Sequence, residues 1–362
     1  MKPKLNIVFC GSINDKTDKS WGKTNQYFLD HLKKVSNVVA VIDYRIKGRF
    51  LKRINKLISF LFFGGSTVRN PFMDFFMERN FEREMKLLQV KPDLVIHSNA
   101  ICITEELAIK CKHVQYSDSA LEGMIDFMAF KPSKKSLKVF RNETSKYIGQ
   151  LSKIYTFNEW TKKTISEKFN VPETKLKNIG FGANLIPFTG EKNYENNLIL
   201  TVLRKGTEKE KGLDLLLEGF KRAKKTNDKL KLAVVGTRGE SIDGVVYYEN
   251  YPREKTVELF HQASLFAMPA MCEPNGMVYI EALACKTPIL GLNRLAFPEF
   301  CDNGQFGFIC EENPESVSKS ILNAFVDLPR LKEMGIKGQR FVIGKYNWNE
   351  VVKKIISDYE DN

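Results

Sequence analysis

Short apolar runs alternate along the chain with longer segments in which apolar residues recur at helical spacing. In the first half the runs fall at 5–10, 38–43, 94–97, 113–116 and 153–157. Runs of this length are typical of strands buried on both faces, and the segments between them are long enough for helices. The pattern therefore predicts an α/β fold in which a parallel sheet carries helices on both faces.

A second set of the same kind follows a polar segment at 186–197, IPFTGEKNYENN, whose Pro, Gly and Asn are typical of a linker. The apolar runs of this set fall at 198–203, 230–236, 265–270, 288–292 and 306–310. A chain of 362 residues is also long for a single core. We therefore expect two sheet-based domains, at 1–185 and 186–345, followed by a helix at 346–362.

Charge and cysteine content narrow the function classes. The net charge of +13 favours anionic partners such as nucleic acid, acidic lipid headgroups or phosphorylated substrates, although a solvated basic surface gives the same total. The seven cysteines include no CxxC pair, so no zinc site or disulfide framework is indicated and a reduced, cytoplasmic protein is favoured. The start, MKPKLNIVFCGS, is typical of a lead into a strand rather than a signal peptide.

A glycine after the first strand is a candidate for phosphate binding. Residues 20–24, SWGKT, end like a nucleoside-triphosphate loop, but that motif also needs a glycine at position 17, where this chain has Thr. A better interpretation of Gly22 is a turn that opens the first helix, where backbone N–H groups meet an anion. An ordinary loop between strand and helix is an equally good interpretation.

Two cations follow the first strand of the second half. Arg204 comes directly after the run at 198–203, and Lys211 precedes a segment with helical spacing. Both therefore belong at the carboxyl edge of the sheet, which is the edge where open α/β sheets bind ligands. A planar Arg fork beside a Lys point charge suits a diphosphate, whereas a solvated basic loop is the alternative.

The segment at 273–288, EPNGMVYIEALACKTP, holds two carboxylates eight positions apart. Pro274 and Asn275 indicate a turn, Gly276 permits a close approach of the backbone to a ligand, and a helix is expected from about Met277 onward. Glu273 then lies before the helix and Glu281 along it, so both reach one ligand of nucleotide-sugar length. Carboxylates accept hydrogen bonds from pairs of sugar hydroxyls. Two acids at this spacing carry no information without the surrounding turn and helix.

A basic amphipathic segment lies at 45–63, RIKGRFLKRINKLISFLFF. Its spacing predicts an interfacial helix on anionic lipid, with a core-packed helix that has a charged outer face as the alternative. The apolar positions at helical spacing are Phe50, Ile54, Leu57, Ile58 and Leu61. The basic face consists of Lys47, Arg49, Lys52, Arg53 and Lys56.

Residues 198–362 together resemble the retaining glycosyltransferases of family 4, also called group 1 glycosyltransferases, and the first half resembles them only loosely. The segments that carry the resemblance are TVLRKGTEKEKGLDLLLEGF, LKLAVVGTRGE, the E-x7-E run that begins at Glu273, PEF, NGQFGFIC and YNWNEVVKKIISDY. The resemblance implies a GT-B fold, in which two Rossmann-like domains face each other across a cleft. It also implies that the helix at 346–362 crosses back to the first domain.

The resemblance assigns roles in holding a nucleotide-sugar. Arg204 and Lys211 are expected to hold the donor diphosphate, Glu273 the sugar hydroxyls and Glu281 the ribose. The remaining donor contacts implied are backbone groups of Asn275, Gly276 and Met277 at the sugar and phosphates, Tyr251 and Pro252 at the base, and Gly22 at the phosphates.

The first domain departs from the family pattern after the strand HVQYS. The family often has a His there, whereas this chain has Ser117 and Asp118. Asp118 is therefore expected to take the place near the donor sugar. His97, at the end of another strand, is a second candidate for substrate contact, although a lone His at a strand end is more often structural.

Together, these expectations predict a retaining glycosyltransferase. It would move a sugar from a UDP- or GDP-linked donor to a lipid-linked or surface-polysaccharide acceptor at the cytoplasmic face of a membrane. No Asp-x-Asp run lies in a suitable place, so no metal and no cofactor are expected. Two alternatives stay open. One is a GT-B nucleotide-sugar 2-epimerase. The other is a nucleic-acid-binding protein. Aromatic and basic residues do not interleave as an RNA-binding sheet requires, which argues against this alternative.

Overall fold

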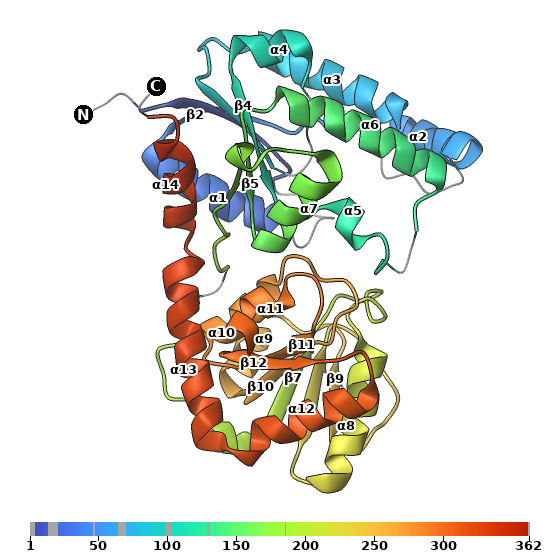
Figure 1. Ribbon diagram of the computed structural model, residues 1–362, viewed down its shortest axis with the longest axis vertical. Helices are drawn as coiled ribbons and strands as arrows, with labels where there is room; N and C mark the ends of the chain where they lie inside the picture. The colour runs from blue at the N-terminus through green and yellow to red at the C-terminus, as the bar shows by residue number, and fades with distance from the viewer. Residues whose placement is uncertain are drawn as a thin grey trace. The chain divides into compact units, whose positions relative to one another are not determined.

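The structure is a computed structural model, and the chain forms two compact units in it (Figure 1). It describes residues 4–13, 21–45, 48–63, 70–98, 101, 103–128, 131–184 and 186–360, without the side chains of 21–23. The first unit comprises Met1–Ile125, Phe130–Gly182 and Trp348–Asn362. The second comprises Asp126–Ala129 and Ala183–Asn347. None of the helices in the described ranges is long and apolar enough to cross a membrane.

The first unit is built on a six-stranded parallel sheet flanked by helices. In sheet order the strands are β2 (Asn37–Ile42), β1 (Asn6–Cys10), β3 (Leu94–Ser98), β4 (Lys112–Ser117), β5 (Lys153–Thr156) and β6 (Leu176–Asn178). The helices are α1 (Trp21–Val35), α2 (Arg49–Phe63), α3 (Pro71–Lys86), α4 (Glu105–Lys110), α5 (Leu121–Met124), α6 (Lys134–Gln150), α7 (Glu159–Phe169) and α14 (Trp348–Ser357). The five strands predicted here are present, and β6 is an edge strand that the apolar pattern missed.

The second unit repeats this architecture with a second six-stranded parallel sheet. In sheet order its strands are β12 (Gly307–Cys310), β11 (Ile289–Leu292), β10 (Leu265–Ala267), β7 (Leu198–Val202), β8 (Lys231–Val235) and β9 (Val245–Tyr248). Its helices are α8 (Leu213–Thr226), α9 (Arg253–Gln262), α10 (Met277–Ala284), α11 (Phe297–Phe300), α12 (Pro314–Val326) and α13 (Leu328–Lys345). The edge strand β9 was again missed by the sequence pattern.

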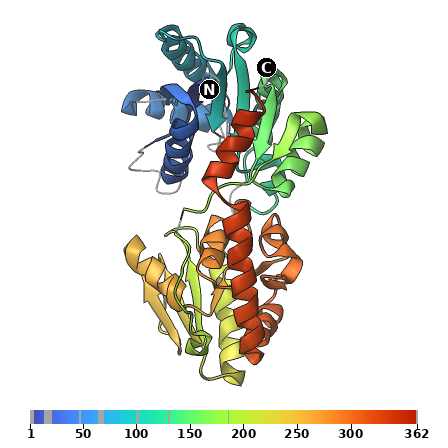
Figure 2. The ribbon, with the colours of Figure 1, turned by 90° about the vertical axis from the view of Figure 1, so that its left-hand side faces the viewer.

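The last helix belongs to the first unit. It packs beside α1, as Figures 1 and 2 show. A Cβ atom at Gly182 would lie 2.1–2.3 Å from the Trp348 indole, so only glycine permits this contact. Beyond the helix, Asp358 accepts hydrogen bonds from Lys153, Lys177 and Tyr155 at 2.8–2.9 Å. The chain that leaves the second unit after α13 is therefore fixed to the sheet of the first.

Two histidines are buried next to each other in the first sheet. His113 Nε2 lies 3.2 Å from the Leu107 carbonyl oxygen, and His113 Nδ1 lies 2.9 Å from His97 Nε2. If Nε2–H of His113 donates to the carbonyl, its Nδ1 accepts from His97 Nε2–H. Nδ1 of His97 is then buried with no hydrogen-bond partner in the described part of the chain. Burial lowers the pKa of His97, with a contribution from His113, and lowers the pKa of His113 to about 4.

The stability of the protein should therefore fall with acidity below about pH 6.5, where unfolded histidine takes up protons that the buried pair does not. The loss should continue as pH falls to about 4, the pKa of folded His113. Each such histidine contributes a slope of about 1.4 kcal/mol per pH unit. Urea unfolding between pH 7 and pH 4.5 measures that slope. His97→Phe should make the slope of stability against pH shallower by about 1.4 kcal/mol per pH unit, the contribution of one proton. His31→Gln, outside the pair, should leave the slope unchanged. Equal slopes in the wild type and both variants would disprove the assignment.

Candidate functional site

Loops at the carboxyl edge of the second sheet carry the two predicted phosphate-binding cations. Arg204 follows β7 in a turn that Thr207 closes, since its backbone N–H and its hydroxyl both donate to the Arg204 carbonyl oxygen. The Arg204 side chain is exposed, and no ion pair to it is found among the described residues. Lys211 precedes α8 and is mostly buried.

Lys211 forms an ion pair with Glu273. Its Nζ lies 2.6 Å from Glu273 Oε2, and both side chains are only 16% exposed. The other carboxylate oxygen, Oε1, accepts hydrogen bonds from the backbone N–H groups of Asn275 and Gly276 at 3.1 Å. Burial alone would raise the pKa of Glu273, but Lys211 and these two N–H groups hold it below its ordinary value. Glu273 is therefore an ionised carboxylate at the N-terminus of α10.

Two glycines make this arrangement possible. Gly212 and Gly276 directly precede α8 and α10, and both have left-handed backbone conformations, with φ of 68° and 59°. A Cβ atom at Gly212 would lie 1.9 Å from the Pro269 carbonyl oxygen, and one at Gly276 would lie 2.0 Å from the Phe300 ring. Any other residue would be strained and would clash, so both turns require glycine.

Glu281 lies in the second turn of α10 and pairs with a cation that the sequence analysis did not single out. Arg253 Nη2 lies 2.9 Å from Glu281 Oε1 and also donates to the Asn184 carbonyl oxygen at 3.0 Å. Glu281 is 14% exposed. No hydrogen bond to its second oxygen, Oε2, is found within the described ranges, which leaves that atom able to accept from a ligand.

The predicted base-flanking residues lie beside this pair. Pro252 caps α9, whose first residue is Arg253, and the Tyr251 ring packs on Tyr248 with centroids 4.5 Å apart. Arg253 also lines a cavity of about 450 Å³ together with Asn184, Phe188, Val257 and His261. Arg253 therefore links the start of α9, which follows Tyr251 and Pro252 in sequence, to Glu281 on α10.

The predicted site residues of the first unit are in different environments. Gly22 is the second residue of α1. Asp118 follows β4 and is 7% exposed, and its Oδ1 accepts a hydrogen bond from the Ser119 hydroxyl at 2.8 Å. His97 has no exposed surface and is stacked on His113. We therefore remove His97 from the candidate site, because its imidazole packs inside the sheet and does not face solvent.

Four of the five basic residues predicted to contact a membrane lie on α2. Arg49, Lys52, Arg53 and Lys56 are all exposed. Lys47 lies outside the described residues.

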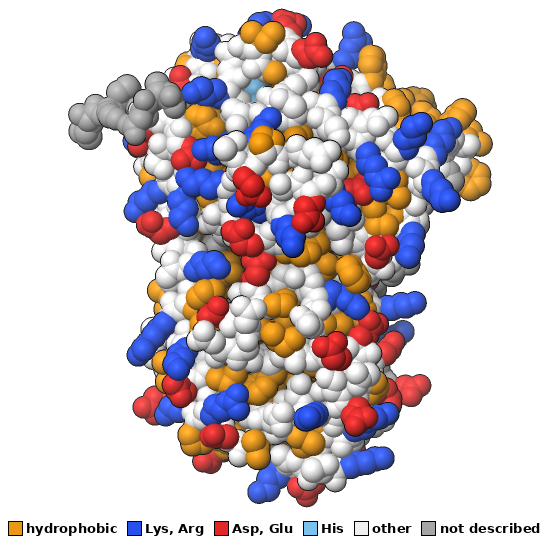
Figure 3. All heavy atoms as spheres, viewed as in Figure 1, with side chains coloured by type: hydrophobic (Ala, Val, Ile, Leu, Met, Phe, Trp, Pro, Cys, Tyr) orange, Lys and Arg blue, Asp and Glu red, His pale blue; other side chains and the backbone are white. Residues whose placement is uncertain are grey.

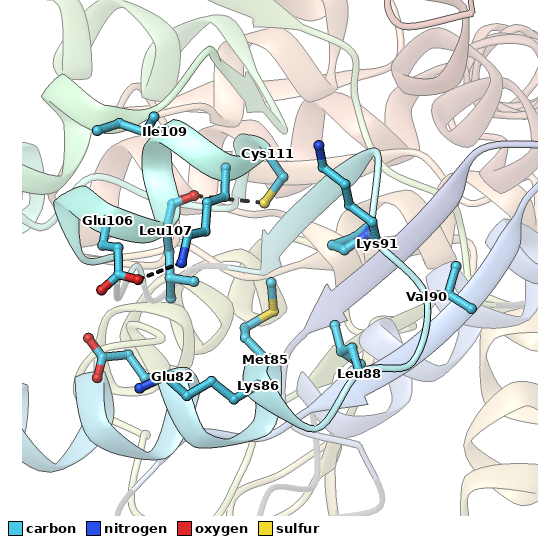
Figure 4. A pocket seen from close by; sticks show the side chains of 12 residues that line it. Glu82, Met85, Lys86, Leu88, Val90, Lys91, Glu106, Leu107, Ile109 and Cys111 are labelled. Carbon is cyan, nitrogen blue, oxygen red and sulfur yellow. Dashed lines mark hydrogen bonds and ion pairs between the residues drawn. The ribbon is translucent and has the colours of Figure 1, made fainter.

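A cavity of about 460 Å³ lies away from these residues, at the opposite edge of the first sheet (Figure 4). Its lining includes Lys91 and Pro92, which precede β3, and Cys111, which precedes β4, so it opens at the amino ends of the strands. Figure 4 shows the Glu106–Lys110 ion pair on its wall and the Cys111 thiol turned toward the Leu107 carbonyl. Burial raises the pKa of Cys111 to about 11, so this thiol stays protonated and is a poor nucleophile.

No group of three or more His, Cys, Asp or Glu side chains that could hold a metal ion is found in the described part of the chain.

Comparison with known proteins agrees with the geometry of the second unit. Residues 184–341 match the family described as glycosyl transferases group 1. An alpha-maltose-1-phosphate synthase of Mycolicibacterium smegmatis is 25% identical over 118 residues, which span 31% of this chain and 30% of that protein. An uncharacterized glycosyltransferase of Methanocaldococcus jannaschii, MJ1607, is 23% identical over 314 residues, spanning 79% of this chain and 80% of the relative.

Solved structures extend the likeness to the whole chain at the level of the fold. WaaG, a glycosyltransferase involved in lipopolysaccharide biosynthesis, has a TM-score of 0.67 at 12% identity and covers 98% of this chain and 99% of its own. A sucrose-phosphate synthase from Thermosynechococcus elongatus has a TM-score of 0.68 at 12% identity, with 99% of each chain covered. The pneumococcal O-GlcNAc transferase GtfA, solved with UDP and GlcNAc, has a TM-score of 0.59 at 15% identity and covers 79% of this chain and 59% of its own.

The two parallel six-stranded sheets are thus those of the GT-B fold. Residues 184–341, which hold the Lys211–Glu273 pair and Glu281, form a domain of the group 1 glycosyltransferases.

Proposed function

We propose that the protein is a retaining glycosyltransferase of family 4 that moves a sugar from a UDP- or GDP-linked donor to a lipid-linked or surface-polysaccharide acceptor. The observation that carries the proposal is the Lys211–Glu273 ion pair at the N-terminus of α10, with Arg204 in the neighbouring loop of a group 1 domain. The proposed enzyme is cytoplasmic and works at a membrane surface; the structural neighbour WaaG, a glycosyltransferase involved in lipopolysaccharide biosynthesis, supports this part of the proposal.

The proposed roles follow from the charges at the site. Breaking the bond between the sugar C1 and the phosphate oxygen leaves a nucleoside diphosphate, whose growing negative charge must be stabilised by fixed cations or dipoles. Arg204 offers a two-pronged donor and Lys211 a point charge, and the backbone N–H groups that open α10 add the positive end of a helix dipole. No metal is needed for that charge in this proposal.

The two carboxylates hold the ends of the donor. Glu273 is ionised and accepts from hydroxyls of the transferred sugar, while Oε2 of Glu281 accepts from the ribose. The acceptor hydroxyl attacks C1 from the face that the diphosphate leaves, and its proton passes to the departing phosphate oxygen. Configuration is then retained without a nucleophilic residue of the protein.

A panel of nucleotide-sugars tests the donor assignment by thermal unfolding. A ligand that binds only the folded protein stabilises it by about 2.7 kcal/mol at one hundred times its dissociation constant, so the matching base and sugar should raise Tm together. If no UDP- or GDP-sugar raises Tm, the proposed function is wrong. Incubation with the donor alone checks the epimerase alternative, because an epimerised sugar would appear without any acceptor.

Glu281→Ala should weaken nucleoside diphosphate binding by about 10- to 100-fold, the range expected when a hydrogen bond to a charged group is lost. Arg253→Ala should weaken it less, because Arg253 holds Glu281 at one oxygen only. Calorimetric titration measures both. Glu258→Ala, an exposed change on α9 away from the cavity that Arg253 lines, is the matched control. Unchanged binding in Glu281→Ala would remove this residue from the ribose site.

A further inference from the structure

Helix α2 exposes large apolar side chains that a soluble protein normally buries. Its exposed fractions are 74% for Phe50, 56% for Leu57, 70% for Phe60, 61% for Leu61 and 58% for Phe62. Figure 3 shows hydrophobic and basic side chains gathered at the outer end of the first unit, where Figure 1 places α2. Single exposed apolar residues are ordinary, but a contiguous patch of this size on a soluble protein marks an interaction surface.

The side of α2 that faces the protein is held by polar contacts. The Asn70 side-chain amide donates to Asn55 Oδ1 at 2.8 Å and to the Ser59 hydroxyl at 3.3 Å, while its own Oδ1 caps α3 by accepting from the Met73 N–H. At the helix end, the Ser133 hydroxyl donates to the Phe63 carbonyl oxygen at 2.7 Å. Polar contacts therefore hold the inner side of α2 together with the buried Phe63, while five of its large apolar side chains stay exposed, which is unusual for a surface helix.

The apolar surface adjoins a stripe of positive charge. Phe50, Leu57 and Leu61 are seven and four residues apart and so share one stripe of the helix. The cations Arg49, Arg53 and Lys56 share the neighbouring stripe. No acidic residue occurs between Arg45 and Phe63, and no ion pair to the three stripe cations is found within the described ranges.

We propose that α2 is an interfacial helix that seats the first unit on an anionic lipid surface, with Leu57, Phe60 and Leu61, which share one face of the helix, inserted among the acyl chains. Apolar side chains next to cations of one sign match a bilayer surface, where the chains enter the apolar layer and the cations meet lipid phosphates. A second copy of this chain fits less well, because pairing the same patch on both partners would bring like charges together.

Vesicle sedimentation tests the proposal on the full chain. The protein should bind vesicles of phosphatidylcholine and phosphatidylglycerol at low salt, bind pure phosphatidylcholine far less, and lose affinity as salt rises. The charge variant Arg49→Gln/Arg53→Gln/Lys56→Gln should reduce binding about a hundredfold at low salt. The apolar variant Phe60→Ser/Leu61→Ser should reduce it at least about tenfold.

Matched controls come from the second unit. Lys319→Gln/Lys332→Gln/Arg340→Gln removes the same charge from exposed positions, and Val326→Ser removes an apolar side chain that is 81% exposed. Both controls should bind like the wild type. Equal losses in the controls and in the α2 variants would overturn the proposal, and so would an absence of binding to anionic vesicles.

A fluorescence measurement tests insertion directly. Tryptophan placed as Leu61→Trp should be quenched by brominated acyl chains, beyond any quenching of the three native tryptophans, whereas Val326→Trp should not. Sedimentation in solution provides the last check: a dimer that Phe60→Ser/Leu61→Ser dissociates would assign the patch to a second copy and overturn the lipid assignment. Vesicle binding is measured without any sugar donor. A protein that does not bind vesicles would therefore overturn the lipid assignment and leave the proposed transferase activity untouched.

Discussion

Replacing Lys211 with methionine should reduce sugar transfer by about a thousandfold or more and destabilise the second unit by about 3–5 kcal/mol. The loss of transfer follows from removing a cation at the leaving diphosphate. The loss of stability follows because Glu273, 16% exposed, would keep its charge without its partner at 2.6 Å. Initial rates and urea unfolding measure the two effects.

The double variant Lys211→Met/Glu273→Gln separates these causes. It removes the unpaired charge, so stability should recover toward the wild-type value while transfer stays lost. Lys209→Met, an exposed change in the same loop, is the control and should alter neither quantity. A Lys211→Met protein with wild-type rates, or a double variant that regains activity, would contradict the assigned role.

Arg204→Ala should lower kcat by about 100- to 1000-fold, the loss typical of removing one donor to a developing anion. Its stability should stay within about 0.5 kcal/mol of the wild type, since the side chain is exposed. Arg204→Lys should recover little of the rate, because an ammonium lacks the planar fork that matches a diphosphate.

Lys205→Ala is the neighbouring control for that experiment. Lys205 pairs with Glu249 at 2.8 Å on the surface, so its removal should leave kcat unchanged. If Arg204→Ala and Lys205→Ala lose the same activity, the loss comes from the general positive charge near the loop rather than from a specific contact of Arg204.

The strands of both sheets were largely predictable because a strand buried on both faces shows its apolar run locally. The edge strands β6 and β9 were not, since LKN is short and polar and VVYY was part of a segment without a bounded run. Assignment of the last helix to the first unit depended on resemblance. No local pattern could show that Trp348 packs on Gly182, 166 residues earlier in the chain.

The candidate site was predictable only where its features are local in the sequence. The turn glycines and the spacing of Glu273 and Glu281 are visible in the sequence, whereas the Arg253–Glu281 pair joins residues 28 positions apart. The sequence left both a structural and a substrate-contacting role open for His97, because its partner, His113, comes from the neighbouring strand. On α2, the inward direction of Asn55 and Ser59 depends on Asn70, which bonds to both and lies outside the helix, so no pattern within the helix could show it.

A crystal structure with a nucleoside diphosphate bound tests the central claim most directly. We expect the diphosphate within hydrogen-bond distance of Arg204 and Lys211, the ribose on Glu281, and the base beside Tyr251 and Pro252. A nucleotide bound elsewhere on the chain, with the Lys211–Glu273 pair and Arg204 untouched, would contradict the account.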